Sequence, residues 1–65
     1  MILNVTHNGV SRDLPGVLPA DTPDGDIRRI AAETLDLDPG TFDHFVVDRF
    51  PETDRLYLRP KVPFG

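Results

Sequence analysis

Cysteine and tryptophan are absent from this chain of 65 residues, and no apolar run approaches the length of a membrane helix. Without cysteine there is no disulfide framework, no thiolate nucleophile and no thiolate zinc site. A membrane helix needs about 20 apolar residues, and no signal-peptide pattern opens the sequence. The formal net charge of −4 disfavours nucleic acid, which binds clustered positive surfaces. We therefore expect one small cytoplasmic domain, stabilised by a compact core, that binds neither nucleic acid nor membrane.

The first fourteen residues predict a β-hairpin with one apolar face. Ile2 to His7 alternates apolar and polar side chains, which is the period of a half-buried strand. Asn8-Gly9 is a strong hairpin signal, because both residues tolerate the positive φ of a type I′ turn. This two-residue turn pairs His7 with Val10, Val5 with Arg12 and Leu3 with Leu14. The expected inner face holds Leu3, Val5, Val10 and Leu14, with His7 and Arg12 at its margin.

A helix is predicted after Thr22-Pro23. Thr22 suits the N-cap and Pro23 suits the first helical position, where its missing N–H has no helical partner to lose. The expected buried stripe has i, i+3, i+4, i+7, i+8 spacing and consists of Ile27, Ile30, Ala31, Thr34 and Leu35. Because a proline disfavours helical backbone at the residue before it, residues 37–40, which include Pro39, are expected to close the helix.

Two further strands are predicted in the second half. The first runs from Phe42 to Phe50, with Phe45 and Val47 on one face and His44, Val46 and Asp48 on the other. The second is Arg55-Leu56-Tyr57-Leu58-Arg59, with both leucines inward and Tyr57 outward. Residues 60–65 contain two prolines, which cannot donate to a sheet ladder, so an extended tail is predicted there.

This order of elements predicts an α+β fold in which one helix covers a four-stranded mixed sheet. A hairpin alone is marginally stable, so the last two strands are expected to join the same sheet. If the first and last strands are central and parallel, the ββαββ order gives a β-grasp. A ferredoxin-like split needs a second helix, for which the chain has no room. We expect one domain over residues 1–59 and a tail over residues 60–65.

The passage into the helix resembles that of ubiquitin. Leu18-Pro19-Ala20-Asp21-Thr22-Pro23 precedes Ile27-Arg28-Arg29-Ile30, and in ubiquitin a proline, a small residue and an Asp-Thr cap likewise precede two apolar residues three apart. Residues 55–59, running into a tail that ends in Gly65, look like ubiquitin's last strand and conjugation tail. The compact segment from Phe42 to Asp54 is similar to prokaryotic ubiquitin-like and multi-ubiquitin domains. The resemblance implies a ubiquitin-like β-grasp and an association with bacterial conjugation-like operons.

The same resemblance implies a protein modifier that is activated at its C-terminal glycine. A partner adenylating enzyme would use ATP to adenylate the Gly65 carboxylate, a thiol-transfer enzyme would capture the acyl group, and a target amine would receive it. No cofactor is expected on the chain itself. Phe64 departs from ubiquitin, which has a second glycine there, and its benzyl group would obstruct an enzyme built for Gly-Gly. The tail would be recognised through Arg59, Pro60, Lys61, Val62 and Pro63.

Lys61 is the only lysine, so lysine-linked chains could form only beside the tail. Single tagging, or chains through the N-terminal amine, is the corollary hypothesis. The alternative is a compositional preference for arginine over lysine.

A non-covalent adaptor is the second hypothesis, binding through the sheet face or an exposed strand edge. Its expected partner-binding patch consists of His44, Val46 and Tyr57. A sulfur carrier is a third hypothesis. The resemblance implies a Gly-Gly ending for that class too, and Phe64 departs from it in the same way. His7 and His44 lack a third ligand at metal spacing, and no catalytic set of residues is present, so neither a metal site nor an enzyme is expected. We expect a monomer.

Overall fold

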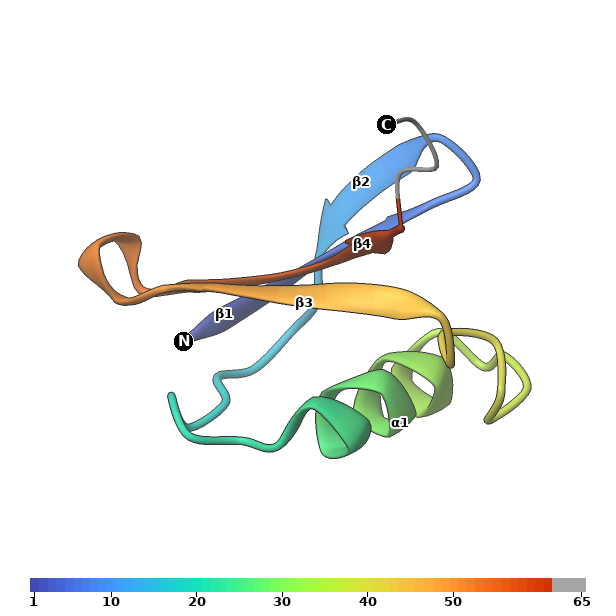
Figure 1. Ribbon diagram of the computed structural model, residues 1–65, viewed down its shortest axis with the longest axis horizontal. Coiled ribbons are helices and arrows are strands. Elements are labelled where there is room, and N and C mark those ends of the chain that lie inside the picture. The colour runs from blue at the N-terminus through green and yellow to red at the C-terminus, as the bar shows by residue number, and fades with distance from the viewer. Residues whose placement is uncertain (62–65) are drawn as a thin grey trace.

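The computed structural model describes residues 1–61 as a small α+β domain, and residues 62–65 lie outside the described part. One helix lies against one face of a four-stranded sheet, which gives two layers (Figure 1). The elements in chain order are β1 (Ile2–His7), β2 (Val10–Asp13), α1 (Asp24–Thr34), β3 (Phe45–Phe50), the 3-10 turn η1 (Pro51–Thr53) and β4 (Arg55–Pro60).

The sheet has the strand order β2-β1-β4-β3. β1 and β4 are the central strands and run parallel, with Leu3 opposite Leu56 and Val5 opposite Leu58. β2 and β3 are antiparallel to their central neighbours and form the two edges. The predicted ββαββ order and the mixed sheet are confirmed, and the topology is compatible with a β-grasp.

The first hairpin has the predicted turn and register. Asn8 and Gly9 have φ angles of 53° and 77°, and His7 lies opposite Val10. The N–H of Leu14 donates to the carbonyl of Leu3 at 2.8 Å, which extends the pairing beyond β2. Val10 is on the predicted face but is 52% exposed. The predicted face is therefore confirmed for Val10, although its side chain stays largely in water.

The helix begins one residue later than the sequence predicts. Pro23 is the N-cap, with extended backbone, and the first helical residue is Asp24. The hydroxyl of Thr22 donates to the carbonyl of Pro19 at 2.7 Å and therefore does not cap the helix. A threonine hydroxyl can form a hydrogen bond within a nearby turn instead of capping a helix, and the Thr22 hydroxyl bonds within the turn.

α1 ends in a Schellman motif, before residues 37–40 where the sequence places its end. The N–H of Leu37 donates to the carbonyl of Ala32 at 2.8 Å, and that of Asp36 donates to Glu33 at 3.2 Å. Asp36 has the left-handed backbone, with φ of 58°, that this motif needs at the residue after the C-cap. The chain therefore turns back along the helix before it reaches Pro39, so Pro39 is not the residue that ends the helix.

The buried face of α1 differs from the predicted stripe. Ile27 and Ala31 are fully buried as expected, but Thr34 is exposed and Ala32 is fully buried in its stead. The Schellman motif brings Leu37 back over Ala32, which is the usual apolar contact of this motif. The helical periodicity predicts only which residues of α1 face the sheet. It does not predict burial by the segment that folds back over the end of the helix.

β3 begins at Phe45 and not at Phe42. Residues 41–44 form turns, and the N–H of Phe45 donates to the carbonyl of Phe42 at 2.9 Å. The Phe42 ring is fully buried, with edge-on contacts to His7 and Phe45 at centroid distances of 5.4 and 4.8 Å. A buried phenylalanine removes a large apolar area from water, so the chain turns to seat this ring in the core.

Two arginines join β3 to the helix. Arg49 donates to the carbonyl of Ala20 at 3.0 Å and pairs with the carboxylate of Asp24. Arg28 Nε donates to the carbonyl of Phe45 at 3.1 Å. These bonds attach both the start and the middle of α1 to the β3 side of the sheet.

The core lies between the helix and the two central strands. Leu56 and Leu58 point inward as predicted, and both are fully buried. The buried apolar residues are Met1, Leu3, Val5, Leu14, Ile27, Ala31, Ala32, Phe42, Leu56 and Leu58. Removal of this apolar area from water is the main stabilising term of so small a domain.

Candidate functional site

The outer face of the sheet, away from the helix, carries an apolar surface on β3 and β4. Side chains alternate along a strand, so residues next to the inward leucines of β4 point outward. The cross-strand pairs Val46–Arg59, Asp48–Tyr57 and Phe50–Arg55 all lie on this outer face.

An aromatic pair forms the centre of this surface. The rings of Phe50 and Tyr57 meet edge-on, with centroids 5.4 Å apart and planes at 79°. Phe50 is 43% exposed, which is a large exposure for a phenylalanine. A shallow hollow of about 440 Å³ lies over the pair and is lined by Thr6, Asp48, Phe50, Thr53, Tyr57 and Arg59. We call these six residues the outer patch.

Charge at the outer patch is internally paired. Arg59 Nε donates to Asp48 Oδ2 at 2.5 Å, so the two charges offset one another beside the rings. Because Asp48 and Arg59 pair with each other, the aromatic pair is the part of the patch that a partner can most easily desolvate.

The outer face of β1 and β2 is polar. Asp13 Oδ1 accepts from Asn4 Nδ2 at 2.9 Å and from the Arg55 guanidinium at 2.7 Å. Ser11 Oγ donates to Asn4 Oδ1 at 2.8 Å. The hydrogen bonds from Asn4 and Arg55 lower the pKa of the Asp13 carboxyl from its usual value. The two halves of this face therefore differ, one aromatic and one hydrogen-bonded.

The structure brings together two of the three residues predicted for a partner-binding patch. Val46 and Tyr57 are both half-buried and share the outer face. His44 is exposed but belongs to the turn before β3, because the strand starts later than predicted. Phe50 was not among the predicted patch residues. Its signal was the alternation Val46, Asp48, Phe50, continued to the end of the strand.

The described part of the predicted tail ends at Lys61. Pro60 is the last residue of β4, opposite Phe45, although the sequence places it in the tail. The fixed φ of proline suits extended backbone, so a strand can carry it at its end. Lys61 is exposed beyond the sheet. Val62, Pro63, Phe64 and Gly65 lie outside the described residues.

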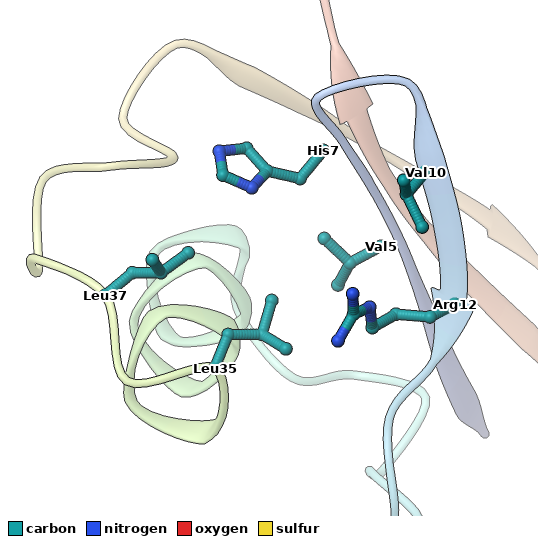
Figure 2. A pocket seen from close by; sticks show the side chains of 6 residues that line it. All are labelled: Val5, His7, Val10, Arg12, Leu35 and Leu37. Carbon is teal, nitrogen blue, oxygen red and sulfur yellow. The ribbon is translucent and has the colours of Figure 1, made fainter.

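A second concave surface lies on the helix side of the sheet, beside the hairpin. It has a volume of about 140 Å³, and Figure 2 shows that its walls come from β1, β2 and the turn that follows α1. The residues that line it, here called the hairpin groove, are Val5, His7, Val10, Arg12, Leu35 and Leu37.

Comparisons with protein-family models, with curated proteins and with solved structures find no match for this chain. Residues 1–61 contain no group of three histidine, cysteine or acidic side chains placed to hold a metal ion. Within the same residues, none of the helical structure is long and apolar enough to span a membrane.

Proposed function

We propose that this chain is a ubiquitin-like β-grasp domain that acts as a protein modifier. The observation that carries the proposal is the central parallel pair of β1 and β4 beneath a single helix. In this arrangement the last strand leaves the middle of the sheet, and the chain passes beyond it at Lys61. The four further residues then lead to Gly65.

The proposed chemistry takes place at the Gly65 carboxylate. A partner adenylating enzyme joins this carboxylate to the AMP part of ATP and releases pyrophosphate. A partner thiol displaces AMP, and a target amine then displaces the thiol to form an amide. The residues from Arg59 to Pro63 are the segment that these partners hold. Because Phe64 precedes the glycine, the proposed enzymes have a channel wide enough for a benzyl group.

The structure bears on how such a modifier would form chains. The Met1 ammonium donates to the carbonyl of Leu18 at 2.5 Å and lies 3.6 Å from an Asp54 carboxylate oxygen. An amine held in this way must break both contacts before it can attack an acyl group. Lys61 is exposed and has no such contacts among the described residues. The proposed order of acceptor reactivity is therefore Lys61 before Met1.

The modifier proposal is tested by searching for its covalent product. The tagged protein is incubated with ATP and a lysate of its own source, and mass spectrometry searches for lysine remnants ending in Phe64-Gly65. Deletion of Gly65 is expected to abolish these adducts. The matched control is Lys61→Arg, which removes the lysine acceptor and leaves the donor carboxylate, so adducts on other proteins should persist. ATP-dependent adducts that survive deletion of Gly65 would contradict the proposal.

A non-covalent adaptor is the second candidate function, and the exposed Phe50–Tyr57 pair favours it. Aromatic residues are enriched at the centres of protein interfaces. The expected result is that partners bound by the wild type are lost from Phe50→Ser. They should be kept by Val17→Ser, which changes a still more exposed apolar residue outside the outer patch. Partners that bind both variants equally would remove the outer patch from consideration.

A further inference from the structure

We propose that Asn8 is a site of spontaneous covalent modification, where the Asn8-Gly9 peptide closes to a succinimide and reopens as aspartate or isoaspartate. The chain contains two asparagines, Asn4 and Asn8, and no glutamine. Both lie in the first hairpin, Asn4 within β1 and Asn8 at the turn. Because their surroundings differ, Asn4 is an internal control for the reaction at Asn8.

The reaction joins the backbone nitrogen of Gly9 to the side-chain carbon Cγ of Asn8. The bond from Cγ to Nδ2 breaks, and ammonia leaves with the proton of the Gly9 N–H. Water then adds to one of the two ring carbonyls. Opening at Cγ gives aspartate, whereas opening at the backbone carbonyl carbon of Asn8 gives isoaspartate, whose main chain continues through the former side chain. The balance is one water consumed and one ammonia released.

The groups that react are free at the turn. Asn8 and Gly9 are both exposed, and beyond the adjoining residues no atom lies within 4 Å of the position that a Cβ on Gly9 would take. Within residues 1–61, the Asn8 side chain forms no hydrogen bond and the Gly9 N–H has no backbone acceptor. The nitrogen and the carboxamide therefore lose no hydrogen bond within the protein when they approach each other.

The turn already gives Asn8 the φ angle that the ring needs. A five-membered ring is nearly flat, so the Gly9 nitrogen must eclipse Asn8 Cβ, which sets ψ of Asn8 at about −120°. That is the ψ of the first central residue in a type II′ turn, whose φ is about +60°. Asn8 has φ of 53°. A flip of the peptide plane between Asn8 and Gly9 therefore converts the type I′ turn into the reactive turn.

Gly9 permits this flip without opening the hairpin. Types I′ and II′ are both turns of two-residue hairpins, so His7 can stay opposite Val10 in each. The two types differ in the sign of φ at the second central residue, and this φ is 77° at Gly9. Glycine adopts either sign because it has no Cβ. The reaction can therefore proceed in the folded protein.

Asn4 is protected by its contacts. Its Nδ2 donates to Asp13 Oδ1 at 2.9 Å and its Oδ1 accepts from Ser11 Oγ at 2.8 Å, so both ends of the carboxamide are held. Asn4 also lies in the extended backbone of β1, paired with a strand on each side. The next residue is Val5, whose β-branched side chain crowds the attacking nitrogen. We expect Asn4 to remain unmodified.

The two products differ in their effect on the hairpin. Either product adds one negative charge to a chain whose formal net charge is −4. Aspartate keeps the turn, since Asp-Gly also suits type I′. Isoaspartate lengthens the main chain by one carbon, so the loop no longer holds His7 opposite Val10. Only isoaspartate therefore disturbs the pairing of β1 with β2.

The first test incubates the folded protein at neutral pH beside the blocked peptide acetyl-Thr-His-Asn-Gly-Val-amide, which has the same local sequence and no fold. Deamidation adds about 1 Da, because NH₂ is replaced by OH, and fragmentation locates the gain. We expect the gain at Asn8, at a rate within about tenfold of the peptide's, because the hairpin permits both turns. A slower rate, or a gain at Asn4 instead, would overturn the inference.

The second test removes the reacting carboxamide. Asn8→Gly keeps a residue that tolerates positive φ, so the hairpin should form. Under the same conditions this variant should gain no mass, and a gain equal to that of the wild type would overturn the assignment to Asn8.

The third test asks whether the ring forms. A protein isoaspartyl methyltransferase should transfer a labelled methyl group from S-adenosylmethionine to the incubated wild type and not to Asn8→Gly. A mass gain without methyl transfer would indicate direct hydrolysis of the carboxamide and would overturn the succinimide route. In NMR spectra, freshly prepared Asn8→Asp should keep the Val10 and Ser11 amide shifts, whereas the isoaspartate form should lose them. Unchanged shifts in the isoaspartate form would contradict the predicted loss of pairing.

Discussion

The inner face of the sheet is filled beneath β1 and β4 and open beneath β2. Leu3 and Val5 of β1, with Leu56 and Leu58 of β4, are at most 2% exposed. One strand away, every residue of β2 is exposed, including Val10, whose side chain lies on the same face. The two regions belong to one sheet and face the same helix. Their difference shows how far a single short helix can cover four strands.

The width of the helix explains the difference. An α-helix with its side chains is about 10 Å across, whereas four strands at about 4.8 Å spacing span about 14 Å. Arg49 and Arg28 fasten α1 towards β3, so the uncovered width falls at the opposite edge. At the end of the helix, Asp36 turns the chain back to bury Phe42 instead of the hairpin tip. The groove is what this arrangement leaves open.

The largest loss of stability is expected from truncating Phe42, whose ring is fully buried in the core. Phe42→Ala should destabilise the domain by about 3–5 kcal/mol, because it removes a fully buried phenylalanine. A domain of this size has a total stability of roughly 3–10 kcal/mol, so much of the variant will be unfolded. Val10→Ala in the open region should cost less than about 1 kcal/mol. Urea unfolding of both variants checks the contrast, and equal losses would abolish the distinction between the regions.

A smaller effect is expected where the loop before the helix is closed. Thr22→Val keeps the shape of a buried side chain but removes the hydroxyl that bonds to Pro19. The Pro19 carbonyl keeps its bond from the Thr22 N–H, so the loss should be about 1 kcal/mol. The measurement is the urea midpoint, with Thr34→Val as the control, because Thr34 is exposed. A loss in the control as large as the loss at position 22 would show that the bond to Pro19 does not decide the result.

Asp36→Gly tests the turn that leaves the groove open, and it should stabilise the protein. Asp36 has φ of 58°, where a residue with a Cβ is strained and glycine is not. We expect a gain of about 0.5–1 kcal/mol, read as a rise in thermal midpoint. Asp38→Gly is the control, because Asp38 is not among the residues with positive φ, and it should give no gain. A loss of stability at position 36 would mean that the aspartate side chain matters more than the backbone.

The smallest expected effect concerns acid pH and the polar outer face of β2. Bonds from Asn4 and Arg55 lower the folded-state pKa of Asp13, so the carboxylate stabilises the fold at neutral pH. That contribution is fully present above the usual aspartate pKa of about 4 and is lost as the pH falls through the lower folded value. The stability difference between the wild type and Asp13→Asn should therefore shrink between pH 6 and pH 2, as urea titrations at each pH would show. A constant difference would contradict the shift.

Local patterns in the sequence predicted the elements that depend on near neighbours. Asn8-Gly9 set the hairpin register, and the alternation around Leu56 and Leu58 set the inward face of the last strand. The β-grasp assignment and the conjugation chemistry remain proposals. Of the predicted outer patch, Val46 and Tyr57 do lie on one face, whereas His44 falls outside the strand.

The errors occur where a local preference competes with a contact made elsewhere. Thr22 was a good cap by sequence, but a turn to Pro19 uses its hydroxyl. Phe42 matched the alternation of a strand, yet the core takes its ring and the strand starts later. In both cases the competing contact forms only in the folded protein. The residues next to Thr22 and Phe42 in the sequence therefore give no signal that predicts it.

The sequence by itself determined the type and order of the strands and the helix, because periodicity and turn chemistry act over a few residues. Only the tertiary structure decided where the helix lies across the sheet, where Asp36 ends it, and which apolar side chains stay in water. The physical reason is that burial depends on the area that one layer can cover. That area is fixed when helix, sheet and returning chain pack together.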